Sequence, residues 1–555
     1  MRAQVVSRRT TAWLLAVAVL FTLLNAWKPL TIDDAFFYSY ARQIAAHPTD
    51  PYGFELLGEG RPKPALHVIA PVVHPYWWAA AIAVFGDVPI LWKFWMFPFA
   101  LILTVALHGL FRRIAPGLEL PLLWMVAFSP AVLPNFNLML DVPAMALGLF
   151  ALERFTRACD SGDWRTALFA GIVAGVAMQT KYTAVTLVAA LLAYGWIYGS
   201  LRLAAVAAAA ASAIFVGWEC ILIAKYGESH FLYALLWGQG SGSFHRGFEL
   251  VVGLVAILGA VAPGIAILAS VAMRASPRAL GAAIAATVIV FAVIPALPAL
   301  PIAGLVFSPE FSAANAELFL FIPLGIFVVV MVVVLFRELT RDAPTQTGRF
   351  LLAWLSIEVM GFALLNPFMA TRRTIGICVV LTAAAGAVAA RRGIGVRDSS
   401  LRLAVGFGIA LGCFFQMADV SDAVVRRSAA ARIAEQLKAL DAAPGETVWV
   451  AGRWAYQFYT ERLGMRQLVA GESRLASGDW VVVAGGLARQ PVPPIQNMSE
   501  SLAKFRIANP WPWSTVPWAY AGPISMRRQP EAQLIISIHQ MQADETLSSL
   551  RGDGL

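Results

Sequence analysis

Apolar stretches of roughly 20 residues recur along most of the 555-residue chain and constrain its fold more than any other feature. A helix needs about 20 mostly apolar residues to cross the hydrocarbon core of a bilayer. Hydrophobic residues make up 59% of the chain and charged residues 14%, whereas soluble domains carry about 25% charged residues. This composition excludes an ordinary soluble enzyme and also a disordered chain. We expect a polytopic α-helical membrane protein.

The apolar runs predict about 13 membrane spans. They cover residues 11–28, 89–111, 120–134, 139–156, 166–180, 183–200, 203–224, 248–273, 279–300, 315–336, 350–368, 374–390 and 402–419. The first run follows Arg8 and Arg9, as the apolar region of a signal peptide would. Its end, LFTLLNAWKPL, has no small-residue cleavage site, so we interpret it as an uncleaved anchor.

Arginines in alternate short connections predict the orientation, because cytoplasmic loops carry an excess of Lys and Arg. These arginines are Arg112, Arg113, Arg154, Arg157, Arg165, Arg202, Arg274, Arg278, Arg337, Arg341, Arg349, Arg391, Arg392, Arg397 and Arg402. The N-terminus is then cytoplasmic, and an odd number of spans places the C-terminus outside. The basic residues do not form a polar basic surface, so the net charge of +9 gives no reason to expect nucleic-acid binding.

Two segments are too polar to lie within the membrane. In a transmembrane domain of residues 1–419, residues 29–88 form a long first outer loop, whose stretches AFFYSYARQIA and HPYWWAAAIAVFG we expect to be interfacial helices. Residues 420–555 begin with a helical pattern. Strand-like ETVWVAG, helix-like AYQFYTERLG and strand-like DWVVVAGG follow. We therefore predict a small outer α/β domain at the C-terminus.

Charged side chains collect on the predicted outer side, where the positive-inside pattern does not explain them. A charge in mid-membrane costs roughly 2.5–3.5 kcal/mol on insertion scales, so each needs a reason. The candidate residues are Asp33, Asp34, Asp141, Lys181, Arg372 and Arg373. Carboxylates that face several cations at one interface suit phosphate chemistry on a lipid carrier.

Each of these residues also has a structural explanation. The two first-loop carboxylates would be solvated flanks of a span, Asp141 would cap a helix, and the cations would reach outer headgroups. Glu219 and Glu358 lie within predicted spans, where a polar partner on a neighbouring helix would explain each of them. His74 favours a loop hydrogen bond, because no HxxxH or HExxH spacing supports a metal site.

Several motifs, in this order, resemble a known enzyme family. They are IDDAFFYSYARQIA, HPYWWAAAIAVFG, MLDVPAMALGLFALERF, TKYTAVTLVAALLAYG, ATRRTIGICVVLTAAAG and VWVAGRWAYQFYTERLGMRQL. The chain resembles the polyprenyl-phosphate-dependent glycosyltransferases of the C-type membrane superfold. It is similar to glycosyltransferase family 39 and its relatives, which include protein O-mannosyltransferases and the aminoarabinose transferase of lipid A. The resemblance covers most of the chain and implies a bacterial-type inner (cytoplasmic) membrane protein.

The resemblance carries over to single positions of this chain. Asp33 and Asp34 match an acidic pair that is usually Asp-Glu, and Asp141 matches the acidic residue that opens the fourth span. Lys181 matches the lysine of a threonine-lysine motif. Arg372 matches an arginine-tyrosine motif in which Arg373 replaces the tyrosine, so which arginine contacts phosphate stays open. His74 matches the histidine of the first-loop His-Pro pair.

The implied reaction is inverting transfer of a sugar from a polyprenyl-phosphate donor to a hydroxyl acceptor on a lipid, glycan or protein. Asp33 would be the general base, with Asp34 and Asp141 as further catalytic candidates. Lys181 with Arg372 or Arg373 would stabilise the departing phosphate, and His74 is a further candidate for substrate binding. The sequence requires no cofactor and leaves a divalent metal open.

A transporter or lipid flippase is the alternative function, but we find no repeated halves of the kind such proteins show. A membrane scaffold is a second alternative. Convergence of Asp33, Asp141, Lys181 and Arg372 on one outward cavity would favour the enzyme, whereas dispersed positions would favour the scaffold.

Overall fold

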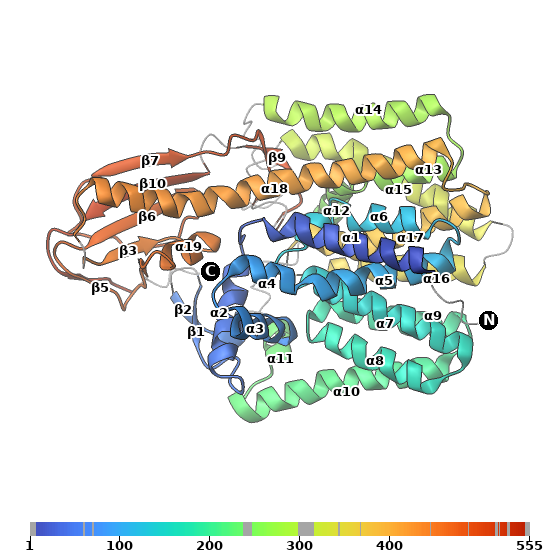
Figure 1. The fold of residues 1–555 in the computed structure, drawn as a ribbon, viewed down its shortest axis with the longest axis horizontal. Helices are drawn as coiled ribbons and strands as arrows, with labels where there is room; N and C mark the ends of the chain where they lie inside the picture. Colours follow the sequence, from blue (N-terminus) through green and yellow to red (C-terminus); the bar gives the residue numbers. More distant parts are fainter. Residues whose placement is uncertain are drawn as a thin grey trace.

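A long helical bundle with a β-sheet region at one end makes up the protein (Figure 1). The computed structural model describes residues 7–58, 61–68, 71–236, 247–297, 316–341, 345–366, 368–443, 446–486, 488–516, 520, 522–529 and 533–549. Parts of the predicted spans 279–300, 315–336 and 350–368 lie outside these residues, as do both chain ends.

The helices follow the predicted apolar runs closely. They are α1 (Arg8–Ala26), α2 (Asp34–Ala46), α3 (Val73–Phe85), α4 (Pro89–Trp95), α5 (Phe97–Ile114), α6 (Glu119–Ala127), α7 (Asp141–Ser161), α8 (Trp164–Met178), α9 (Val185–Ile197), α10 (Leu201–Tyr226), α11 (His230–Leu236), α12 (Gly247–Val261), α13 (Pro263–Ala272), α14 (Pro277–Val293), α15 (Ala316–Thr340), α16 (Gln346–Leu364), α17 (Ile375–Arg391), α18 (Ser399–Ala439) and α19 (Ala455–Glu461). Short 3-10 helices are η1 (Ala65–His67), η2 (Leu133–Asn135), η3 (Tyr182–Ala184), η4 (Ile294–Ala296) and η6 (Thr371–Thr374).

The chain is a multi-pass membrane protein, as predicted. Within the described residues, eight helices are long and apolar enough to cross a bilayer, and α12 with α13, bent by 75°, would make a ninth. The predicted count of about 13 stays a prediction. One run differs clearly: residues 120–134 do not form a continuous helix, because α6 ends at Ala127 and turns lead to η2. Pro130 and Pro134 follow α6, and proline cannot continue a helix.

Arginines of the predicted inner connections link several of these connections in pairs. Arg113 pairs with Asp160, which joins the connection after α5 to the one after α7. Arg392 Nη2 lies 2.7 Å from Glu338 Oε1, and Arg274 donates to the carbonyl of Arg392 at 2.6 Å. Connections that the alternating pattern assigned to the same side are therefore neighbours in space.

The first loop and the C-terminal region contain the strands. Their bounds are β1 (Glu55–Gly58), β2 (Arg61–Pro64), β3 (Val448–Ala451), β4 (Arg466–Gln467), β5 (Arg474–Leu475), β6 (Trp480–Gly486), β7 (Ala503–Ile507), β8 (Trp513–Ser514), β9 (Arg527–Arg528), β10 (Leu534–Gln540) and β11 (Glu545–Thr546). The largest sheet has the order β4-β3-β6-β10-β7. Strand β6 is parallel to β3 and antiparallel to β10. The predicted strand, helix and strand of the C-terminal region correspond to β3, α19 and β6.

One helix connects the bundle to this sheet. Helix α18 runs for 41 residues through position 419, where we placed the boundary between the two domains. Its second half packs Val425, Ala429, Ile433 and Leu437 into one apolar core with β6 and β10. In Figure 1, α18 extends along the bundle and on into the sheet region, while the start of α1 lies toward the opposite end.

Close packing of α18 on the segment after α6 generates a prediction. A β-carbon at Gly412 would overlap the backbone carbonyl of Phe128, while one at Gly406, on the same helix, would meet nothing within 4 Å. We expect Gly412→Ala to destabilise the protein by about 1–3 kcal/mol, because backbone atoms cannot move aside cheaply. Gly406→Ala should leave stability unchanged or slightly higher. Thermal unfolding in detergent micelles would measure both, and equal melting temperatures would contradict the packing argument.

Candidate active site

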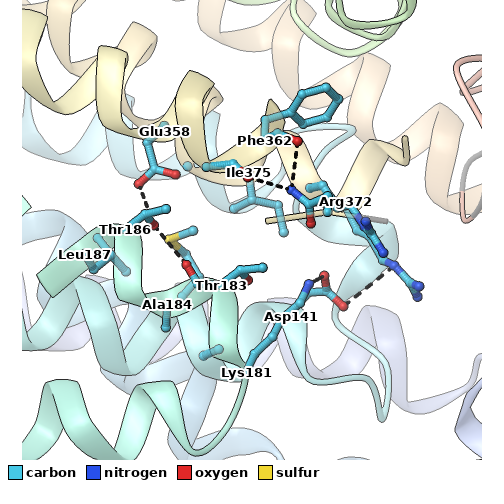
Figure 2. Close-up of a pocket in the computed structure, with 16 residues that line it drawn as sticks. Asp141, Lys181, Thr183, Ala184, Thr186, Leu187, Glu358, Phe362, Arg372 and Ile375 are labelled. Atoms are coloured by element: carbon cyan, nitrogen blue, oxygen red, sulfur yellow. Dashed lines mark hydrogen bonds and ion pairs between the residues drawn. The ribbon is translucent and has the colours of Figure 1, made fainter. Parts of the chain in front are cut away.

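A pocket of about 520 Å³, open to its surroundings, lies where α7, α9, α16 and α17 meet. Sixteen residues line it, including Asp141, Lys181, Arg372 and Arg373. Figure 2 shows Asp141, Lys181 and Arg372 together on one side of the pocket and Glu358 on the other. Four of the six candidate charged residues on the predicted outer side, Asp141, Lys181, Arg372 and Arg373, thus line one cavity.

The Asp141 carboxylate is the centre of the charged side. It opens α7 and is paired through Oδ1 with the Lys181 ammonium, while Oδ2 lies 3.9 Å from Arg372 Nε. The Asp141 side chain is only 6% exposed. Lys181 has extended backbone (φ −159°, ψ 126°) at the break between α8 and η3, so the chain changes direction there instead of continuing as a helix.

Arg372 connects Asp141 to the first loop. It belongs to η6, just before α17. Its Nη1 and Nη2 lie 3.2 and 3.3 Å from Asp33 Oδ2. Asp33 is 27% exposed, which makes it more accessible than Asp141. It is not among the residues that line the pocket and reaches its edge through Arg372.

The neighbouring Arg373 is held differently. Its Nη1 donates to the carbonyl of Phe368 at 2.6 Å, and its guanidinium carbon lies 3.8 Å from the centre of the Phe368 ring. Both arginines line the pocket. Arg372 is paired with carboxylates, whereas Arg373 has a neutral carbonyl and an aromatic face as its partners.

Asp34 and His74 do not line the pocket. Asp34 is fully buried and accepts a hydrogen bond from the Thr31 amide at 2.9 Å. Burial raises the pKa of Asp34, and Lys93, 3.9 Å away, opposes this rise. His74 Nε2 donates to the carbonyl of Leu138 at 2.8 Å, and burial lowers the pKa of His74 to about 4. The neutral ring thus fixes the segment that leads to Asp141.

A buried ion pair at the edge of the site was missed by sequence reasoning. Lys28, just after α1, pairs with Asp419 on α18, and both side chains are at most 1% exposed. Asp419 also accepts hydrogen bonds from Tyr520 at 2.9 Å and from Thr515 at 2.8 Å. The Tyr520 ring centre lies 5.8 Å from the Arg372 guanidinium carbon. The C-terminal region therefore contributes an aromatic ring that lies beside Arg372.

Both membrane glutamates have hydrogen-bond partners, as the structural explanation predicted. Glu219 accepts from Tyr182 at 3.0 Å and from Ser229 at 2.6 Å. Glu358 accepts from Trp354 Nε1 at 3.0 Å and from Thr186 at 3.4 Å, yet it also lines the pocket.

The site has little in common with a metal centre. Within the part of the chain that the structure describes, no group of three or more His, Cys, Asp or Glu side chains is arranged to hold a metal ion. Asp141, which lines the pocket, and Asp33, at its edge, are each paired with cationic side chains instead.

No protein-family model and no curated protein matches the chain. Among solved structures, the chain is similar to the oligosaccharyltransferase of Archaeoglobus fulgidus tethered with an acceptor peptide (15% identity, TM-score 0.46, 82% of this chain and 63% of that one). It is also similar to AglB of that organism in complex with an inhibitory peptide and a dolichol-phosphate (14%, 0.45, 83% and 65%). A third is ArnT from Cupriavidus metallidurans bound to undecaprenyl phosphate (12%, 0.40, 96% and 98%).

The chain spans less than two thirds of the length of the oligosaccharyltransferase chains.

The buried pair of Lys28 and Asp419 predicts a large loss of stability when it is broken. Lys28→Met leaves a carboxylate buried without its charged partner, which costs about 3–5 kcal/mol. The matched control is Asp160→Asn, which breaks the pair with Arg113, whose side chains are 29% and 39% exposed. Such an exposed pair contributes about 0–1 kcal/mol. Equilibrium unfolding in mixed micelles would measure both, and similar losses would argue against a special role for the buried pair.

Proposed function

We propose that the protein transfers a sugar from a polyprenyl-phosphate-linked donor to a hydroxyl acceptor, with inversion, at the outer face of a bacterial-type cytoplasmic membrane. The convergence of Asp141, Lys181, Arg372 and Arg373 on one pocket, with Asp33 at its edge, carries this proposal. A scaffold protein gives no reason for such convergence. A transporter or lipid flippase is the alternative function, because paired charges also serve ion and proton pathways in transporters, and the transfer assay below distinguishes the two.

The cations suit a phosphate that gains charge as it leaves. Lys181, Arg372 and Arg373 face the pocket, while Asp141 and Asp33 are the carboxylates paired with Lys181 and Arg372. Partly buried cations gathered on one side of a pocket stabilise a departing phosphate better than fully water-exposed cations would. Arg372 and Lys181 are the favoured phosphate ligands, because carboxylates hold both in place.

Asp33 is the favoured general base. Its side chain is partly exposed and belongs to the first loop. Asp34 is fully buried and accepts a hydrogen bond from the Thr31 amide of the same loop, which suits a positioning role. A phosphate bound to Arg372 would share the guanidinium with Asp33 and weaken their ion pair. The Asp33 carboxylate could then accept the acceptor's hydroxyl proton.

The bond changes in the proposed step balance without a further reactant. As the proton moves to Asp33, the acceptor oxygen forms a bond to the anomeric carbon. The bond between that carbon and the phosphate oxygen breaks, and the polyprenyl phosphate leaves with the electron pair. A single displacement of this kind inverts the configuration at the anomeric carbon. None of these steps uses a nucleotide or requires a metal.

The acceptor class stays open among lipid, glycan and protein hydroxyls, because no residue of the site selects between them. Profiling of lipids and glycans from a strain that lacks the protein would identify the class, since the missing product carries the acceptor.

Loss of the base should slow the chemical step without weakening the donor complex. We expect Asp33→Asn to lower kcat by about 100-fold or more, while the KM for the donor stays the same or falls because Arg372 loses a competing carboxylate. The control is Asp87→Asn, which alters a 50% exposed carboxylate elsewhere in the first loop and should retain full activity. Transfer from a radiolabelled polyprenyl-phosphate sugar in membranes measures both, and full activity of Asp33→Asn would remove the proposed base.

Loss of a phosphate ligand should instead weaken binding of the donor. Lys181→Ala and Arg372→Ala should each raise the donor KM by about tenfold or more, because a hydrogen bond to a charged group is lost. Lys225→Ala, which removes a 36% exposed cation on α10, should change neither constant. Normal donor saturation in both site variants would contradict the assignment of these residues to the phosphate.

A further inference from the structure

Glu358 reaches the pocket from the side opposite the cations. It lies on α16, one of the membrane-spanning helices, and is 8% exposed. Its Oε1 accepts from Trp354 and Thr186, whereas Oε2 has no hydrogen-bond partner among the described residues. A carboxylate within a span is costly, so one that keeps an oxygen free beside a pocket points to a ligand.

The backbone of α17 makes room for this free oxygen. Gly376, in the first turn of α17, lines the pocket beside Glu358. A β-carbon at position 376 would overlap Glu358 Oε2. Glycine therefore permits the carboxylate to lie against α17 and face the pocket, where a larger residue would push it aside.

The same side of the pocket carries further polar groups. Thr183, Thr186 and Asn366 line it together with Glu358. The Asn366 side-chain amide donates to the carbonyls of Gly361 and Phe362 at 3.1 and 3.2 Å, whereas its own side-chain oxygen accepts no hydrogen bond within the described part of the chain. Hydroxyl groups and hydrogen-bond acceptors gathered in one pocket suit a ligand that presents several hydroxyls.

We propose that Glu358, Thr183, Thr186 and Asn366 bind the sugar of the donor, with a sugar hydroxyl donating to Glu358 Oε2. This inference rests on the proposed function. The charges of the pocket orient the donor: the cations attract its phosphate, and Glu358 repels phosphate from the other side. With the phosphate at the cations, the neutral, hydroxyl-rich sugar attached to it lies toward Glu358, where its hydroxyls find hydrogen-bond acceptors.

Binding measurements on the purified full-length protein test this subsite without knowledge of the acceptor. The probes are undecaprenyl phosphate alone and undecaprenyl phosphate linked to glucose, galactose, mannose or xylose, each titrated by thermophoresis in detergent. We expect at least one sugar-linked probe to bind about tenfold or more tightly than the bare carrier. Glu358→Gln should abolish that gain and leave the Kd of the bare carrier within about twofold of the unmodified protein's value.

Two further variants separate sugar binding from a merely structural role. Gly376→Ala keeps the carboxylate but displaces it, so it should also abolish the gain from the sugar. Ser356→Ala, on the exposed face of the same helix, should keep the gain. If Glu358→Gln does not fold, Gly376→Ala decides the question alone.

The possible results distinguish this inference from the function on which it rests. The subsite would be overturned if the attached sugar tightened binding equally in Glu358→Gln, Gly376→Ala and the unmodified protein. The absence of any gain across the four sugars would overturn it as well. Failure of bare undecaprenyl phosphate to bind, or unchanged binding of it in Arg372→Ala, would instead overturn the proposed function.

Discussion

Pairing of the buried Asp141 carboxylate is the interaction on which the site depends. A carboxylate this deeply buried is tolerated only when opposite charges and hydrogen bonds compensate for the lost water. Lys181 and Arg372 provide that compensation from two distant parts of the chain. The start of α7, the break before η3 and the start of α17 are therefore held at one point. Arg372 extends the same linkage to Asp33 in the first loop.

A second buried pair links the C-terminal region to this arrangement. Lys28 lies a few residues before Asp33, and its partner Asp419 receives a hydrogen bond from Tyr520. The Tyr520 ring in turn faces Arg372. The segment between α1 and α2 is thus fixed from both sides, by Arg372 at one end and by Asp419 at the other. The C-terminal region is therefore part of the structure of the site and not only an extension of the bundle.

Much of the helical architecture follows from the sequence alone, because about 20 apolar residues in a row have few alternatives to a membrane span. Scarce charges likewise identified Asp33, Asp141, Lys181 and Arg372, since each charge in such a chain needs a reason. The break between α6 and η2 was not predicted, because apolar composition outweighed Pro130 and Pro134 in our interpretation. The pairing of Lys28 with Asp419 was also out of reach, because 391 positions separate them and only the tertiary fold joins them. Both residues lie at the ends of predicted spans, where a charged residue is usually a solvated residue that flanks the membrane.

The length of α18 has a mechanical consequence. At 1.5 Å per residue, its 41 residues form a rod about 60 Å long, of which roughly 30 Å lies beyond position 419. A sheet mounted on an unbroken rod cannot swing like a hinged lid unless the rod bends or the Asp419 contacts break. Movement around the pocket is then left to smaller segments, η3, η6 and the first loop, rather than to rotation of the whole C-terminal region. The rod also sets how far the sheet lies from the membrane-spanning part of the bundle.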